Sequence, residues 1–343
     1  MGDDSVSTEF DTAVRVLFRT RGNHTQGMGD LHGVLALARE LENQGCQTAV
    51  MAEPDPEAAE FLNAAGLAHL RACSNPNDYD LARSFNPDIV IFNMLRNDPR
   101  YISGFRPLAR MLVTIDDDGP AAKQADLRIN PLYPVKDSLS DLSFIFLKKE
   151  FRDIHTRKRK WSQQVRRVLV TAGGADTYGF LPITARAAAR ACRDWNLDVV
   201  TGPAFCHHSE LKTALSSCAH QGCEVSGSVS DMHERMVRAD LIVCGAGMTL
   251  FEAACCGTPA VVVCNEPFEE VTAQRMARAG FGINLGFHKP PDLKAVQDAA
   301  AALAESPEQR ERMGRIGRKL VDGNGAARTV EAIASRYRRK YLT

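Results

Sequence analysis

A glycine-rich turn between an apolar strand and a helix is the segment of this sequence best suited to hold a phosphate group. An apolar run of strand length, residues 240–244, leads into it. The turn consists of Gly245, Ala246, Gly247, Met248 and Thr249. Glycines allow a sharp turn and a close approach of the backbone to a ligand. The following helix offers N–H groups and the positive end of its dipole to an anion, and Glu252, one turn further, could reach a ribose hydroxyl. The alternative is a plain strand–helix crossover whose glycines serve packing only.

A second pair of glycines, Gly173 and Gly174, follows another predicted strand. Adjacent glycines leave backbone N–H groups free to cradle an anion, and Asp176 could cap the helix that follows. We therefore assign these three residues to the same nucleotide-binding function as the turn at residues 245–249.

A third loop, after the first predicted strand, contains Gly27 and Gly29 and then Asp30. The glycines are candidate phosphate-binding positions. Asp30 has two interpretations: it caps the helix that starts here, or it acts as a general base that projects from the strand end. His32 is the second candidate for the base.

Two patterns could indicate a metal site. Residues 116–118 are three consecutive aspartates, but Gly119 and Pro120 follow them and make an ordinary turn the favoured interpretation. A set of cysteines and histidines matches no zinc-ligand spacing: Cys206, His207, His208, Cys218, His220 and Cys223. We expect no metal ion and no cofactor.

The order of strand and helix signals predicts two domains. Buried strands are expected at residues 14–18, 47–52, 88–92 and 111–115, with helical patterns between them, and the same alternation restarts at residue 167. It predicts an α/β protein with two doubly wound, Rossmann-like parallel sheets that face a cleft. The expected boundaries are a disordered N-terminus (1–12), a first domain (13–150), a linker (151–165), a nucleotide-sugar-binding domain (166–325) and a C-terminal helix (326–343).

Composition narrows the functional classes. The chain has 343 residues, with 42 basic and 42 acidic side chains. This balance argues against nucleic acid as a partner, and no apolar run is long enough to span a membrane. Ten scattered cysteines are typical of reduced thiols, so we expect a cytoplasmic protein.

Six motifs occur in one order along nearly the whole chain: residues 27–30, IDDDGP (115–120), INP (129–131), KKEF (148–151), GGAD (173–176) and GAGMTLFEAACCGTP (245–259). Together they resemble GT-B nucleotide-sugar enzymes. The resemblance is to the pseudaminic-acid pathway hydrolase of UDP-2,4-diacetamido-2,4,6-trideoxy-β-L-altropyranose and to spore-coat polysaccharide glycosyltransferases. The carboxyl-terminal half is similar to the UDP-N-acetylglucosamine transferase that makes lipid II. The resemblance implies a pyrophosphate at Gly245–Thr249, a ribose at Glu252, and a final helix that returns to the first domain.

Two departures from these relatives matter. The hydrolase and the lipid II enzyme have histidine where this chain has Asp30, although antibiotic glycosyltransferases of the same class have aspartate there. After Asn265 the paired glutamines of the lipid II enzyme are missing, and Glu269, Glu270 and Gln274 are the candidates for contacts with the sugar.

We therefore expect an inverting glycosyltransferase that uses a nucleotide-activated sugar with UDP as the nucleotide, and a glycan or protein acceptor. A nucleotide-sugar hydrolase and a non-catalytic nucleotide-sugar-binding protein are the alternatives. A dinucleotide-dependent oxidoreductase is disfavoured, because the first loop places His32 where a dinucleotide fingerprint needs its third glycine.

Overall fold

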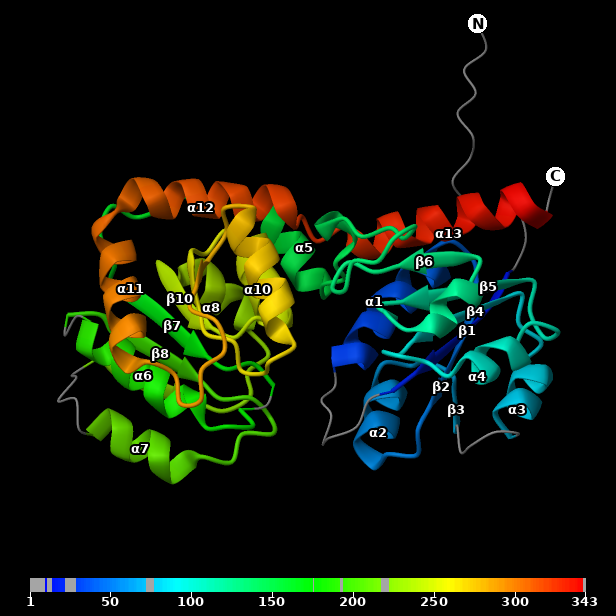
Figure 1. Ribbon diagram of the computed structural model, residues 1–343, viewed down its shortest axis with the longest axis horizontal. Coiled ribbons are helices and arrows are strands. Elements are labelled where there is room, and N and C mark those ends of the chain that lie inside the picture. The colour runs from blue at the N-terminus through cyan, green and yellow to red at the C-terminus, as the bar shows by residue number, and fades with distance from the viewer. Residues whose placement is uncertain are drawn as a thin grey trace, which may run out of the picture. The chain divides into compact units, whose positions relative to one another are not determined.

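The computed structural model describes residues 10, 14–21, 29–71, 77–174, 176–191, 194–216 and 222–341. The chain divides into two compact units (Figure 1). The first unit comprises residues 1–148 and 324–343, and the second comprises residues 149–323. None of the helices in the described ranges is long and apolar enough to cross a bilayer.

The first unit is built on a six-stranded parallel sheet with the strand order β3-β2-β1-β4-β5-β6. Its strands are β1 (Arg15–Thr20), β2 (Gln47–Ala52), β3 (His69–Arg71), β4 (Ile89–Asn93), β5 (Met111–Ile115) and β6 (Leu127–Ile129). Its helices are α1 (Gly29–Asn43), α2 (Pro56–Ala64), α3 (Asn77–Phe85), α4 (Pro99–Gly104) and α13 (Gly325–Tyr341), with 3₁₀ turns at Pro120–Gln124 and Leu142–Phe144.

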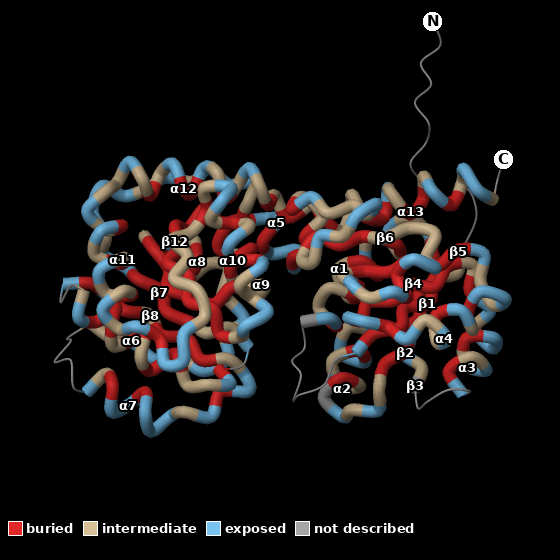
Figure 2. The backbone as a smooth tube through the Cα atoms, in the orientation of Figure 1, coloured by how far each residue is buried: buried red, intermediate tan, exposed pale blue. Residues whose placement is uncertain are grey.

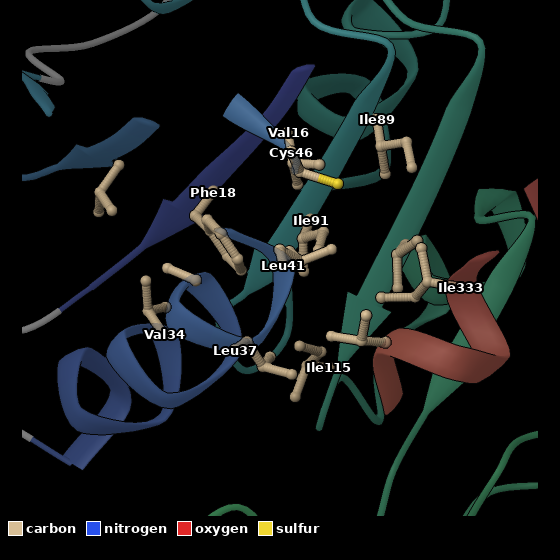
Figure 3. Packing of buried hydrophobic residues seen from close by; sticks show 14 of the residues in the cluster. Val16, Phe18, Val34, Leu37, Leu41, Cys46, Ile89, Ile91, Ile115 and Ile333 are labelled. Atoms are coloured by element: carbon tan, nitrogen blue, oxygen red, sulfur yellow. The ribbon is translucent and has the colours of Figure 1, made fainter. Parts of the chain in front are cut away.

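Alternate residues of the central strands point to opposite faces of this sheet, and both faces are buried. Val16 and Phe18 of β1 join a core with α1, α2 and α13, whereas Leu17 lies in a second core with α3 and α4. Figure 3 shows the first of these cores, with Leu37 and Ile333 reaching it from α1 and α13. A strand buried on both faces reads as a continuous apolar run, which is why β1 and β4 are visible in the sequence.

The final helix completes the core of the first unit. Ile333 and Tyr337 of α13 are buried, and the Tyr337 hydroxyl lies 3.3 Å from Asp88 Oδ1. The ring of Phe10 meets Tyr337 edge-on at 6.1 Å and is also buried, so at least this residue of the predicted disordered N-terminus belongs to the core. The other residues of that terminus lie outside the described part of the chain.

The second unit repeats the architecture with the strand order β12-β11-β10-β7-β8-β9. Its strands are β7 (Arg167–Thr171), β8 (Asn196–Val200), β9 (Cys223–Ser226), β10 (Leu241–Cys244), β11 (Ala260–Val262) and β12 (Ile283–Asn284). Its helices are α5 (Lys149–Thr156), α6 (Phe180–Ala191), α7 (His208–Ser216), α8 (Met232–Arg238), α9 (Met248–Cys256), α10 (Glu269–Arg278), α11 (Leu293–Glu305) and α12 (Pro307–Leu320). Figure 2 shows buried residues concentrated in the strands of each unit.

Residues 151–165, expected to form a linker, lie within the second unit. Residues 151–156 of this segment belong to helix α5. Beyond it, Arg159 donates hydrogen bonds to the carbonyl groups of Val237 and Ala239, and Trp161 Nε1 donates to the Gly257 carbonyl at 2.8 Å. The carbonyl groups thus accept hydrogen bonds from a basic and an aromatic side chain of residues 157–165, and these bonds hold the segment against α8 and α9.

Each sheet has a switch point, where the order of strands reverses. It lies between β1 and β4 in the first unit and between β7 and β10 in the second. Open α/β sheets bind ligands beyond the carboxyl ends of the strands at this point. The loops that follow these four strands are therefore the candidate ligand-binding loops.

Candidate functional site

The glycine-rich turn follows β10, at the switch point of the second sheet. Helix α9 starts at Met248, with Gly247 before it and no side chain capping its first N–H groups. A Cβ atom on Gly245 would clash with the side-chain amide of Asn265, so the turn accepts only glycine there without rearrangement. The structure thus presents an uncapped helix N-terminus at the edge where a ligand is expected.

The Gly173–Gly174 loop lies next to this turn. A Cβ atom on Gly173 would lie 3.3 Å from Thr249 Oγ1, and the φ angle of Gly173 is +82°, in the left-handed region. Gly202, after β8, fits so closely against Gly173 and Gly174 that a side chain there would clash with their carbonyl groups. The two loops that the sequence assigned separately to the nucleotide are therefore brought together.

Asp176 caps the helix that follows the loop. Its carboxylate is buried and accepts hydrogen bonds from the backbone N–H groups of Phe180, at 2.7 Å, and Leu181, at 2.8 Å. Burial raises the pKa of Asp176, and these two hydrogen bonds oppose the rise. Both carboxylate oxygens thus satisfy orphan donors of α6.

Glu269 contacts the glycine-rich turn through its carboxylate, a contact that the sequence did not indicate. Its Oε2 accepts hydrogen bonds from the N–H of Ala246, at 3.1 Å, and from the N–H of Asn265, at 2.7 Å. Burial raises the pKa of Glu269, while the two backbone hydrogen bonds lower it. Glu269, expected to contact the sugar, is therefore tied to the glycine-rich turn, and the Ala246 N–H is used by its carboxylate.

Three other predicted residues lie on α9 and α10. Glu252 is half-buried in α9, three residues after Thr249 and so on the same face of the helix. Gln274 is exposed in α10, four residues after Glu270 and on its face. Glu270 Oε1 accepts a hydrogen bond from the Phe287 N–H at 3.1 Å.

In the first unit, Asp30 is the second residue of α1, and so lies inside its first turn. Asn93, the last residue of β4, donates a hydrogen bond from Nδ2 to the Asp30 carbonyl at 3.0 Å, which ties the helix start to the switch point. The surrounding protein partly removes the Asp30 carboxyl from water, and this desolvation raises its pKa to about 6. The positive charge of Arg21 opposes the rise. Solvent still reaches the side chain. Gly29 begins α1, and Gly27 lies outside the described residues.

His32 points away from Asp30. Two residues on a helix are about 200° apart, so the two side chains occupy different faces. The His32 ring meets Phe61 of α2 edge-on, at 4.7 Å and 86°. Only Asp30 is therefore placed near the switch point by this geometry.

The three aspartates after β5 have separate partners. Asp116 Oδ1 accepts from the Leu132 N–H at 2.8 Å, the buried Asp117 accepts from Asn97 Nδ2 at 2.7 Å, and Asp118 pairs with Arg96 at 3.1 Å. Within the described ranges, no group of three or more histidine, cysteine or acidic side chains is arranged to hold a metal ion. Cys218 and His220 lie outside those ranges.

Comparison with known proteins identifies the fold. No family model matches the chain. It is 24% identical over 270 residues to an uncharacterised protein of Methanocaldococcus jannaschii, covering 73% of this chain and 55%, about half, of that protein. It is 23% identical over 340 residues to the spore coat polysaccharide biosynthesis protein SpsG of Bacillus subtilis, covering 92% and 96% of the two chains.

Solved structures match over nearly the whole length. MurG of Acinetobacter baumannii has a TM-score of 0.66 at 16% identity and covers 94% of this chain and 99% of its own. The calicheamicin glycosyltransferase CalG4 has a TM-score of 0.64 at 17% identity, with 96% and 99% covered. The UDP-GlcNAc 2-epimerase of Neisseria meningitidis has a TM-score of 0.62 at 14% identity, with 94% and 100% covered. The chain therefore has the GT-B fold, as the order of its motifs predicted.

Proposed function

We propose that this protein is an inverting glycosyltransferase that takes a sugar from a nucleotide-activated donor, with UDP as the nucleotide. The observation that carries the proposal is the meeting of two glycine loops at the switch point of the second sheet. There Gly173 lies beside Thr249, at the uncapped start of α9. The SpsG relative, named for polysaccharide biosynthesis, and the GT-B fold both support this activity.

The donor would bind through its diphosphate. The Ala246 N–H is occupied by Glu269, so we expect the N–H groups of Gly247, Met248 and Thr249 to hold the phosphate oxygens. They would stabilise negative charge on the leaving nucleoside diphosphate as the glycosidic bond breaks, without a metal ion. Glu252, on the same helix face as Thr249, would bind the ribose hydroxyls.

Asp30 would act as the general base. Its carboxylate removes the proton of an acceptor hydroxyl, and the resulting oxygen attacks the anomeric carbon on the side opposite the leaving diphosphate, which inverts the configuration. A base is most effective when its pKa lies close to the working pH, and the raised pKa of Asp30 brings it closer. Glu269 and Gln274 are the candidates for contacts with the sugar.

Hydrolysis is the second candidate, because solvent reaches Asp30 and a water molecule could take the place of the acceptor. The products would then be free sugar and nucleoside diphosphate.

The seven cysteines in the described part of the chain are free thiols, which is typical of proteins in a reducing compartment. We therefore propose the cytoplasm as the site of either reaction.

Mass spectrometry of products separates these activities. The protein is incubated with a panel of UDP-sugars, with and without candidate glycan acceptors. Release of UDP only when an acceptor is present identifies a transferase, whereas UDP and free sugar without an acceptor identify a hydrolase. Nucleotide binding without turnover under any condition would contradict an enzymatic role and favour a nucleotide-sugar-binding protein.

A further inference from the structure

Two adjacent glutamates at the start of α10 hold two different loops. Glu269 accepts a hydrogen bond from Ala246 in the turn after β10, and Glu270 accepts one from the Phe287 N–H in the loop after β12. The turn and the Phe287 loop are thereby fixed relative to the same helix end. Phe287 and the turn are therefore both held at the N-terminal end of α10.

Three aromatic rings connect the Phe287 loop to the Gly173–Gly174 loop. The ring centroids of Tyr178 and Phe287 are 5.8 Å apart, and Phe180 lies 5.7 Å from Tyr178 and 5.8 Å from Phe287. Phe180 is buried, whereas Tyr178 and Phe287 remain half-exposed. Lys289 places its Nζ 4.1 Å from the centre of the Tyr178 ring and covers one of its faces.

These contacts form a rim at the carboxyl ends of β10 and β11. The rim runs from the turn through Glu269 and Glu270 to Phe287 and on to Tyr178, which lies four residues after Gly174 in the chain. Within it, Asn265 after β11 donates from Nδ2 to the Ala172 carbonyl at 2.6 Å. One side of the rim is therefore acidic and the other aromatic.

A pyranose ring is complementary to this rim. Its edge carries groups that donate hydrogen bonds, which suit the acidic side, and its C–H face is apolar, which suits the aromatic side. Glu269 uses Oε2 for its two backbone partners, and its Oε1 lies near Gly247, 3.2 Å from the position of a Cβ there. A carboxylate oxygen accepts hydrogen bonds from hydroxyl and amide N–H groups. The half-exposed rings offer an apolar surface on the other side.

We propose that Phe287 and Tyr178 form the stacking surface for the donor sugar. The sugar class accepted is a pyranose that presents an apolar C–H face to these rings and hydroxyl or N–H donors to Glu269. The inference rests on the proposed function, since the sugar reaches the rim only if its diphosphate sits on the turn at residues 247–249.

The test compares the binding of UDP with that of UDP-sugars. Calorimetric titrations use UDP and a panel of UDP-glucose, UDP-galactose, UDP-N-acetylglucosamine and UDP-N-acetylgalactosamine. We expect the wild-type protein to bind at least one sugar nucleotide more tightly than UDP. In Phe287→Ala that preference should fall by about twofold to tenfold, the range for an aromatic contact, while the affinity for UDP is unchanged.

Three variants make the result interpretable. Phe287→Tyr keeps the ring and should keep the preference. Phe85→Ala makes the same truncation at a half-exposed ring of α3 in the first unit, outside the aromatic cluster, and should also keep it. Thermal unfolding of each variant checks its folding, and if Phe287→Ala does not fold, Phe287→Leu replaces it.

Several outcomes would overturn the inference. A preference that Phe287→Ala leaves intact removes the ring from the sugar site. So does an equal loss of affinity for UDP and for the sugar nucleotides, and so does a wild-type protein that prefers no member of the panel to UDP. If UDP itself does not bind, the proposed function fails first, and this result is distinct from the others.

Discussion

The acid limb of the pH–rate profile should report the ionisation of Asp30. Surrounding protein raises the pKa of this carboxyl to about 6, from an ordinary value of 3.8. A general base must be ionised to accept a proton. With a pKa of 6, about nine tenths of the carboxyl is ionised at pH 7 and about one tenth at pH 5. We therefore expect turnover to fall about tenfold between these pH values, whereas an unshifted aspartate would give almost no change.

Asp30→Asn should abolish most of this activity without unfolding the protein. Loss of a general base typically costs about 10²–10⁴-fold in turnover. The bond that ties the helix start to Asn93 uses the backbone carbonyl of residue 30, which the substitution keeps. Because the folded-state pKa is raised, ionisation of Asp30 opposes folding as the pH rises above its ordinary pKa. The asparagine variant is therefore expected to be at least as stable as wild type at pH 7.

Arg21 provides an independent check on the same carboxyl. Its positive charge lowers the pKa of Asp30, so Arg21→Gln should move the acid limb to higher pH. The assay is UDP release at saturating donor between pH 4.5 and 8.5, with unfolding temperatures measured on the same preparations. Full turnover in Asp30→Asn, or an acid limb that stays in place in Arg21→Gln, would refute the assignment of the limb to Asp30.

Three further predictions concern stability. Gly245→Ala should lower the unfolding temperature because its Cβ meets Asn265, whereas Gly174→Ala, with open space at its Cβ, should leave it nearly unchanged. Glu269→Ala leaves two backbone N–H groups without their acceptor and should cost about 1–3 kcal/mol in urea unfolding, and Glu269→Gln should restore part of this. Ile333→Ala truncates a fully buried side chain of α13 and should cost about 2–5 kcal/mol, and an unchanged urea midpoint would place α13 outside the core of the first unit.

The fold was predictable because the central strands of both sheets are apolar on both faces. Strands such as β4 and β10 appear in the sequence as short apolar runs, and their alternation with helices predicted two doubly wound sheets. The edge strands β3 and β12 were missed. They have three and two residues, too short to show a pattern, and their place is set by pairing with β2 and β11.

The site was only partly predictable, because its contacts depend on the order of strands in space. Gly173 and Thr249 come together since β7 pairs with β10, which is not its neighbour in the sequence. Nothing local shows that Glu269 reaches back 23 residues to Ala246. The adjacent residues Glu269 and Glu270, which follow β11, are the feature of the sequence that indicates a candidate site here.

The affinity of UDP for the wild-type protein and for Glu252→Ala tests the central claim most directly. Glu305→Ala, at an exposed glutamate in the last turn of α11, is the matched control. Losing hydrogen bonds between a charged group and the ribose should cost about 1.5–3 kcal/mol, or roughly tenfold to a hundredfold in affinity. We predict this loss in Glu252→Ala and none in the control. Absence of UDP binding, or equal affinity in all three proteins, would contradict a nucleotide site at the turn after β10.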